Sequence, residues 1–263
     1  MNAVILETAA EKGNKGEKDE IASIRELFEK RHDNEFCKSK FSDHCGEGGI
    51  EVISPNTHLA YTSVKEIIKA KSTSKADIIV RYNNANGQTK CWNISYKSLT
   101  GAPPSIINHT PRSAKVFQAF GDLHHHVSGL DILSKEYIEK RTQSLFKEDV
   151  KIGMFDTYKN DEQVRQSMLH VVCYFVFKGT GRKKSVHECN AILIKNRDGS
   201  HRFTTYETDD EKLEYIRSII EQCVISFRSK NMPRLSSNAC LPWAYMSDTG
   251  KACGSIHIRL AHK

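Results

Sequence analysis

The stretch from Ala76 to Ser98 constrains the fold most, because two strand patterns flank a turn within it. Residues 77–82 are rich in β-branched and aromatic side chains, and residues 89–97 alternate polar with apolar side chains. Between these two runs stands "NNANG", a cluster of turn residues that ends on Asn-Gly. The stretch therefore predicts an antiparallel β-hairpin.

The predicted hairpin brings Asp77, at the start of its first strand, close to Lys97, at the end of its second. Side chains alternate between faces along a strand, so Ser95 points the same way as Lys97. A carboxylate suits Mg²⁺, and a nearby lysine can orient an attacking water, which together favour phosphodiester hydrolysis. A surface ion pair without catalytic function is the alternative interpretation.

The other patterns predict a mixed α/β chain with a β-rich second half. Helical spacing predicts helices at 17–31, 62–71, 112–126, 134–147 and 209–223. Apolar or alternating runs predict strands at 170–179, 188–196, 201–207, 241–247 and 254–260. Glycine and prolines predict a loop at 99–111. No internal repeat interrupts the 263 residues, so one domain is predicted.

The charge distribution permits a polyanionic partner. The chain has 39 Lys and Arg against 32 Asp and Glu, a formal net charge of +7. From Arg228 to Lys263, six basic residues stand against one acid, Asp248. A basic segment that also carries strand patterns is typical of a surface that contacts phosphates, and a basic solvated face is the alternative.

The last predicted strand presents polar side chains that are suited to reading bases. Ser255, His257 and Arg259 share one face of it, and the residues between them are apolar. A half-buried strand alternates in this way by default. An arginine, however, can bind O6 and N7 of guanine with two hydrogen bonds, worth about 1–3 kcal/mol of discrimination. The strand is therefore a candidate for base recognition.

Asp77 together with Ser95-Tyr96-Lys97 resembles the D…(D/E)-x-K signature of the PD-(D/E)xK nucleases, most closely type II restriction endonucleases of the MspI-like branch. Residues 242–263 are similar to the C-terminal end of that branch, and residues 15–30 to the first helix of its GCGC-cutting member. These three segments cover about 60 of the 263 residues. The chain departs from the signature at Ala76, where proline is usual, and at Ser95, where an acid is usual.

The resemblance implies one nuclease domain over residues 1–263, with a restriction-endonuclease-like central mixed β-sheet flanked by helices and a β-rich C-terminal part. It implies Mg²⁺ as the cofactor and double-stranded DNA as the substrate, cut at a short, palindromic, G/C-rich site. The catalytic residues it implies are Asp77, Ser95, Lys97 and Glu20, with Glu17 as the alternative to Glu20. Its metal ligands are Asp77, the backbone carbonyl of Tyr96, and Ser95, directly or through water.

The resemblance also concentrates DNA recognition in residues 98–126 and 228–263. The residues expected to contact DNA are Ser98, Thr100, Ser105, Asn108, Arg112, Ser247, Lys251, Ser255, His257 and Arg259. A cognate DNA methyltransferase belongs to such a system without direct contact. Palindromic sites favour a homodimer, and action as a monomer is the alternative.

The apolar runs are too short to cross a membrane, and no basic segment precedes the apolar patch near Met1, so a prokaryotic cytosolic protein without a membrane partner is expected. The eight cysteines form no C-x-x-C and are expected to be reduced. One alternative is a zinc site formed by His32, Cys37, His44 and Cys45. Another is a metal-binding or DNA-binding role for the histidine run His124–His126.

Two other functions stay open at this point. One is a structure-specific repair or junction nuclease of the same fold, and the other is a non-catalytic DNA-binding module. The base-reading strand favours a sequence-specific enzyme over a structure-specific one. Asp77 and Lys97 favour an enzyme over a binding module.

Overall fold

The computed structural model describes residues 21–22, 61–70, 74–84, 86–99, 104–108, 127–179, 188–197, 201–227, 244–246, 252–254 and 256–260. The chain divides into two compact units. The first consists of residues 1–100 and 186–206, and the second of residues 101–185 and 207–263. The single nuclease domain predicted from the sequence would contain both units.

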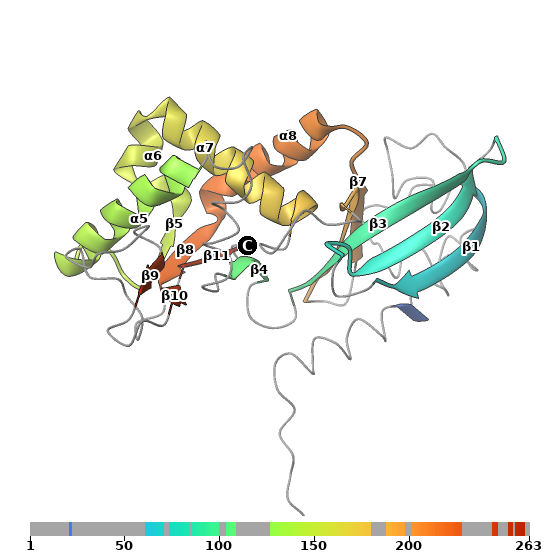
Figure 1. Cartoon of the computed structure of the whole chain (residues 1–263), viewed down its shortest axis with the longest axis horizontal. Coiled ribbons are helices and arrows are strands. Elements are labelled where there is room, and N and C mark those ends of the chain that lie inside the picture. The colour runs from blue at the N-terminus through green and yellow to red at the C-terminus, as the bar shows by residue number, and fades with distance from the viewer. Residues whose placement is uncertain are drawn as a thin grey trace, which may run out of the picture. The chain divides into compact units, whose positions relative to one another are not determined.

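The first unit is built on a five-stranded mixed sheet in the order β1-β2-β3-β6-β7 (Figure 1). Its strands are β1 (Tyr61–Lys69), β2 (Ile78–Asn84), β3 (Thr89–Ser98), β6 (Ala191–Lys195) and β7 (His201–Thr205). β3 and β6 run parallel, and the other neighbours run antiparallel. The predicted hairpin, formed by β2 and β3, is confirmed, and Gly87 takes a φ of 74° in its turn.

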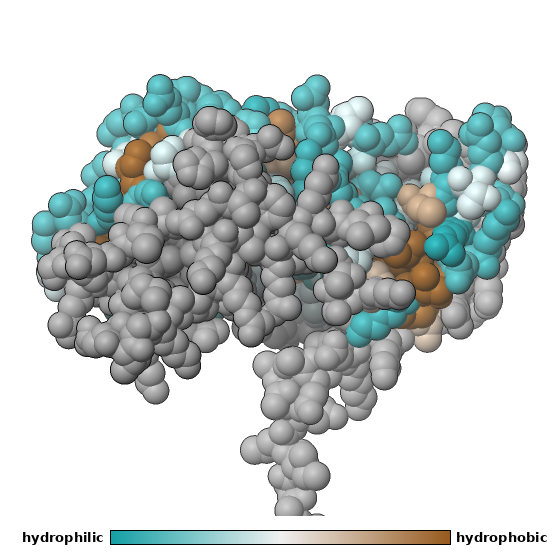
Figure 2. Space-filling model, in the orientation of Figure 1, coloured by the Kyte–Doolittle hydropathy of each residue, from teal (hydrophilic) through white to brown (hydrophobic). Residues whose placement is uncertain are grey.

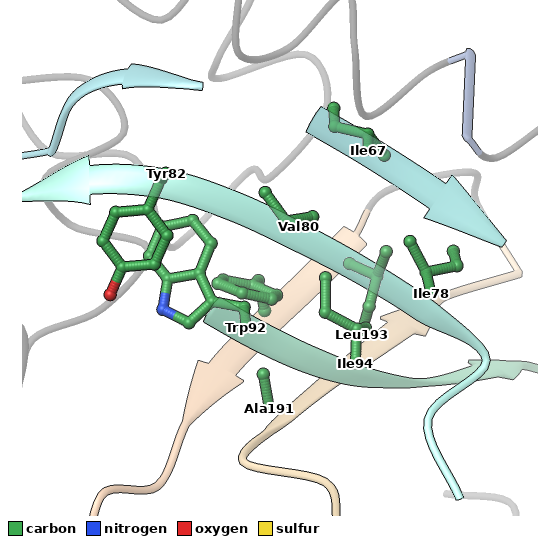
Figure 3. Close-up of a cluster of buried hydrophobic side chains, with 9 residues drawn as sticks. Ile67, Ile78, Val80, Tyr82, Trp92, Ile94, Ala191 and Leu193 are labelled. Atoms are coloured by element: carbon green, nitrogen blue, oxygen red, sulfur yellow. The ribbon is translucent and has the colours of Figure 1, made fainter. Parts of the chain in front are cut away.

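One face of this sheet carries the apolar core of the first unit, with side chains from all five strands (Figure 3). The ring centroids of Tyr82 and Trp92 lie 4.3 Å apart, and those of Trp92 and Phe203 lie 5.4 Å apart. Trp92 is 5% exposed, so packing accounts for this residue. Packing on this face therefore anchors the hairpin to the sheet, and Ser95 and Lys97 lie on the opposite face.

The helix predicted at 62–71 is wrong, because this segment is the edge strand β1. Its pairing with β2 is irregular between Val64 and Glu66, so that one extra residue stands in β1. Val64 therefore pairs with Tyr82 and Ile67 pairs with Val80, two positions on one face of β2. The bulge gives a strand the three-residue apolar spacing that is typical of a helix.

The second unit contains a four-stranded antiparallel sheet in the order β4-β11-β8-β5 and a two-stranded ribbon. The sheet consists of β4 (Ser105–Asn108), β11 (Ile256–Arg259), β8 (Val224–Phe227) and β5 (Asp149–Lys151), and the ribbon of β9 (Ala244–Met246) and β10 (Ala252–Gly254). The helices are α5 (Val127–Thr142), α6 (Asp156–Asn160), α7 (Glu162–Cys173) and α8 (Asp209–Ile219). Short helical turns occupy Ile152–Met154, Tyr174–Lys178 and Ile220–Gln222.

The strand predicted at 170–179 is wrong, because the segment is the end of α7 followed by a π-helical turn over Tyr174–Lys178. Asp161 caps the helix by accepting the backbone N–H groups of Gln163 and Val164. The residues buried here are Val171, Val172, Cys173, Phe175, Val176 and Phe177. Only one residue per turn, at His170, Tyr174 and Lys178, is partly exposed, so the apolar run between His170 and Lys178 resembles a buried strand in sequence.

The loop predicted at 99–111 contains the strand β4. A strand of four residues is too short for its apolar and polar pattern to indicate it in the sequence. α5 begins and ends earlier than the helix predicted at 134–147. The strands at 188–196, 201–207, 241–247 and 254–260 and the helix at 209–223 are confirmed within a few residues. Of the helix predicted at 17–31, Ile21 and Ala22 are described and are helical, and the helix at 112–126 lies outside the described residues.

The mixed α+β class and the β-rich C-terminal part are therefore confirmed. Figure 2 shows a mostly hydrophilic surface over the helices of the second unit on the face that it presents. None of the described helices combines the length and the apolar character needed to cross a bilayer. Cys91, Cys173, Cys189 and Cys223 are free thiols, of which Cys91 is exposed and the other three are buried.

Candidate active site

Strand register places Asp77 beside Ser95 at one end of the hairpin. Ile78 pairs with Ile94, and the backbone N–H of Asp77 donates to the Ile94 carbonyl at 2.8 Å, which extends the ladder by one residue. The side chain of Asp77 is 31% exposed and that of Lys97 is 20% exposed. Both side chains are therefore sheltered by the fold and still open to a ligand.

Three polar atoms converge at this end of the hairpin. Oδ2 of Asp77 accepts the backbone N–H of Tyr96 at 2.8 Å. Nζ of Lys97 lies 3.9 Å from the same Oδ2 and donates to the Tyr96 carbonyl oxygen at 3.2 Å. The carboxylate and the carbonyl that the resemblance implies as metal ligands thus face one cation, the Lys97 ammonium.

Ser95 is 1% exposed, and its Oγ has no hydrogen-bond partner among the residues that the structure describes. An unsatisfied buried hydroxyl costs about 1–3 kcal/mol, so natural proteins keep few of them. The residue lies on the same face as Lys97, next to Asp77, and pairs with Ile192 of β6 on its other side. Its hydroxyl therefore keeps an unused hydrogen bond next to Asp77.

A second lysine joins the cluster, and the sequence analysis missed it. Burial and, to a smaller extent, the charge of Lys97 lower the pKa of Lys75 to about 8, against the raising effects of Cys189 and Asp77. Lys75 precedes Asp77 by two residues, the spacing of side chains on one face of an extended chain. That spacing is the signal in "KADII" from which its position could have been predicted.

The donor set of the site is compatible with Mg²⁺. Carboxylate, carbonyl and hydroxyl oxygens are the ligands that this ion takes, and it commonly uses one or two carboxylates and retains several waters. Within the described ranges, no group of three or more His, Cys, Asp or Glu side chains is placed to hold a metal. Asp77, the Tyr96 carbonyl and Ser95 would therefore hold the ion together with water.

The third acid predicted for the site, Glu20, lies outside the described residues, as does its alternative Glu17. The neighbouring Ile21 is described and packs against the core cluster of the five-stranded sheet, as Tyr96 does. The start of the chain therefore belongs to the same unit as the hairpin.

Four of the residues predicted to contact DNA meet on two adjacent strands of the second unit. His257 pairs with Asn108, and Arg259 pairs with Ser105, across an irregular β4–β11 ladder. Two stretches that are about 150 residues apart in the sequence thus share one sheet. Ser98 ends β3 in the first unit, where it pairs with Lys195.

The remaining predicted residues lie outside the described residues: Thr100, Arg112, Ser247, Lys251 and Ser255. The same is true of the alternative metal sites at His32, Cys37, His44 and Cys45 and at His124–His126. Their assignments stay predictions.

No protein-family model matches the chain, and no curated protein matches it in sequence. Among solved structures, the chain is similar to the restriction endonuclease MspI in complex with its cognate DNA. The two are 11% identical, with a TM-score of 0.36, and the match covers 76% of this chain and 68% of that one. A likeness of this size carries no residue assignment.

Arg259 has intramolecular partners that sequence reasoning also missed. Its Nη2 forms an ion pair with Oδ1 of Asp149 on β5 and donates to Oγ of Ser226 on β8 at 3.2 Å. Asp149 stands next to Ser226 in the sheet, and Ser226 stands next to His257. A row of polar residues therefore crosses the sheet beside the candidate recognition strand.

Proposed function

We propose that this protein is a Mg²⁺-dependent, sequence-specific endonuclease of the type II restriction class that hydrolyses double-stranded DNA. One observation carries the proposal: Asp77 Oδ2 and the Tyr96 carbonyl oxygen converge on Lys97 Nζ. The buried, unsatisfied Ser95 hydroxyl lies on the same face.

Each residue has a distinct part in this proposal. Asp77 binds the ion through its carboxylate, which keeps acceptor capacity beyond the Tyr96 N–H bond. Ser95 holds either the ion or one of its waters. Lys97 donates a hydrogen bond to the attacking water or to a phosphate oxygen, and its charge stabilises the negative charge that develops on the phosphorus centre.

The ion, when bound, polarises the scissile phosphate and lowers the pKa of a water molecule. If Asp77 and the Tyr96 carbonyl held the ion, Lys97 would give up its hydrogen bond to that carbonyl, because the ion and Lys97 are both positively charged. The 3.9 Å separation from Asp77 is long for an ion pair, so this exchange costs little. Lys75 adds positive charge to the cluster, which favours a phosphate in the site.

Sequence recognition is assigned in this proposal to the sheet that carries Arg259 and His257, with Ser105 and Asn108 on the neighbouring strand. The basic segment from Arg228 to Lys263 adds phosphate contacts. A nuclease of this class requires a methyltransferase that protects the same sites in host DNA. A homodimer fits a palindromic site.

A non-catalytic DNA-binding module is the second candidate, and the charge of the cluster favours it. Two lysines, Lys75 and Lys97, stand against the single carboxylate of Asp77 in the described part of the site. Such a cluster binds a phosphate without cleaving it when no ion joins it.

The test is incubation of the purified chain with phage DNA and Mg²⁺, followed by gel electrophoresis. Discrete fragments that disappear with EDTA support the proposal. A smear, or cutting of branched substrates alone, supports a structure-specific nuclease. Retained, salt-sensitive binding without cutting supports the binding module.

Lys97→Ala is the decisive variant, and Lys90→Ala is its matched control. Lys90 is an exposed lysine on the same strand, so its removal changes the net charge equally. Lys97→Ala is expected to lower the cleavage rate by about 10²–10³-fold, as loss of a group that stabilises a transition state does. Near-normal turnover by Lys97→Ala would place the catalytic site elsewhere.

A further inference from the structure

The ion pair between Arg259 and Asp149 joins a central strand to an edge strand of the four-stranded sheet. Arg259 lies on β11, Asp149 lies on β5, and β8 runs between them. The Arg259 side chain is 26% exposed and the Asp149 side chain 55% exposed. Ion pairs this open to water add little stability.

The guanidinium of Arg259 is held in one orientation. Its Nη2 contacts both the Asp149 carboxylate and the Ser226 hydroxyl, and Ser226 is 7% exposed. Its Nε is shielded from water and has no hydrogen-bond partner among the described residues. A planar fork fixed in this way loses little side-chain entropy when it binds a ligand.

The pair presents hydrogen-bond donors beside an acceptor. Arg259 keeps Nη1 as its free donor, because Nη2 already contacts Asp149 and Ser226 and Nε is shielded, and the carboxylate of Asp149 accepts. In the major groove a G·C pair offers two acceptors on guanine, N7 and O6, followed by the N4 donor of cytosine. An A·T pair offers an acceptor, a donor and an acceptor in the same positions. The protein pattern complements the G·C pair and conflicts with the A·T pair.

The carboxylate also argues against a phosphate as the partner of Arg259. A lone arginine on a polar sheet face attracts the DNA backbone, whereas the Arg259–Asp149 pair has a formal charge of zero. Asp149 repels a phosphate that approaches the guanidinium. A neutral base edge meets no such repulsion.

We infer that Asp149 and Arg259 together read one G·C base pair of the DNA target, with Arg259 on the guanine and Asp149 on the cytosine amino group. The inference rests on the proposed function and adds to it a specificity-determining residue, Asp149, on a strand outside the predicted recognition segments. Ser226 is the positioning residue that holds the fork.

The experiment begins with the unmodified chain, whose target site is read from the ends of its cleavage products. Cleavage rates are then measured on the cognate duplex and on duplexes with one base pair replaced at a time. Asp149→Ala is expected to lower discrimination against A·T at one G·C position by about 5-fold, the low end of the range for a base contact, because the carboxylate accepts a single hydrogen bond. The other positions keep their discrimination.

Arg259→Lys removes the planar fork and is expected to relax discrimination at the same base pair. Asp149→Asn retains the shape of the side chain and adds a donor, so it is expected to shift tolerance toward A·T at that position. Glu214→Gln is the matched control, because Glu214 pairs with Arg217 on α8 in another exposed ion pair. Thermal melting checks that each variant is folded.

Three results would overturn the inference. The first is a uniform loss of rate on all duplexes in Asp149→Ala, as a structural ion pair would give. The second is relaxation at different base pairs in the Asp149 and Arg259 variants. The third is the absence of any cleavage by the unmodified chain, which separates failure of the proposed function from failure of this reading alone.

Discussion

Two carboxylate–lysine clusters in this protein differ in how fully their charges are satisfied. In the first unit, Asp77 accepts one backbone N–H and lies 3.9 Å from Lys97. In the second unit, Glu136 accepts the backbone N–H groups of Asp156 and Thr157 and the Thr157 hydroxyl, and lies 2.8 Å from Lys140. The Glu136 cluster is complete, whereas the Asp77 cluster is loosely bonded.

The lysines of the two clusters show the same difference. Burial lowers the pKa of Lys140, but hydrogen bonds to Asp156 and Glu136 outweigh burial and raise the pKa overall. In Lys75, burial and the charge of Lys97 prevail, and the pKa falls to about 8. In a cluster that stabilises the fold, hydrogen bonds offset the cost of removing the charges from water. A cluster in which this cost is only partly offset is typical of a functional site.

The comparison predicts opposite effects for two isosteric substitutions, and Asp77→Asn is the larger. This variant is expected to lower cleavage at least about 10³-fold, because it removes the carboxylate that would hold the ion in the proposed mechanism. The free energy of unfolding is expected to change by less than about 1 kcal/mol, since the ion pair is long and part-exposed. Single-turnover kinetics and urea unfolding measure the two effects. A variant that loses stability but cleaves normally would reverse the assignment.

Glu136→Gln is expected to cost about 2–4 kcal/mol of stability while the folded fraction cleaves at the normal rate. Glu136 is 8% exposed and caps α6, whose N-cap residue Phe155 supplies no side-chain hydrogen bond. Burial raises the pKa of Glu136, but hydrogen bonds from Lys140, Thr157 and Asp156 lower it overall.

The sign of the pH dependence follows from that lowered pKa. The contribution of Glu136 is fully present above its ordinary value of 4.5 and is lost as the pH falls through the lower folded value. Urea unfolding between pH 3 and 6 should therefore show a smaller acid loss in Glu136→Gln than in the unmodified protein. If both proteins lost the same stability in acid, the hydrogen bonds to Glu136 would not stabilise its charged form.

Lys75→Met is expected to raise the free energy of unfolding at pH 7 by roughly 2 kcal/mol, because it removes a charge that burial disfavours. In the unmodified protein the unfolded chain keeps the Lys75 proton between about pH 8 and 10.5, whereas the folded chain releases it. The free energy of unfolding of the unmodified protein therefore rises with pH across this window, and that of Lys75→Met does not show this rise. Lys90→Met, at an exposed position, is the control and should retain the rise.

The hairpin and its site were predictable because their signals are local. Asn-Gly marks the turn, and alternation fixes which residues face one way, so the proximity of Asp77 and Lys97 follows from the sequence. β1 and the end of α7 were not predictable, since a bulge changes the apolar spacing of β1 and only one residue per turn at the end of α7 is partly exposed. The Arg259–Asp149 pair spans 110 residues, and no local pattern indicates a contact of that range.

Ser95 provides the smallest of the expected effects and the most direct test of an incomplete cluster. Ser134 is its matched control, a buried serine whose Oγ donates to the Leu130 carbonyl at 2.7 Å. Ser95→Ala is expected to leave stability unchanged or raise it by up to about 1 kcal/mol, because the lost hydroxyl has no partner among the described residues, whereas Ser134→Ala loses a bond. Cleavage by Ser95→Ala should fall about tenfold if the hydroxyl holds the ion or its water, and the Mg²⁺ concentration for half-maximal rate should rise. A Ser95→Ala variant as destabilised as Ser134→Ala, with an unchanged Mg²⁺ requirement, would make Ser95 a core residue and reduce the site to Asp77, Lys97 and the Tyr96 carbonyl.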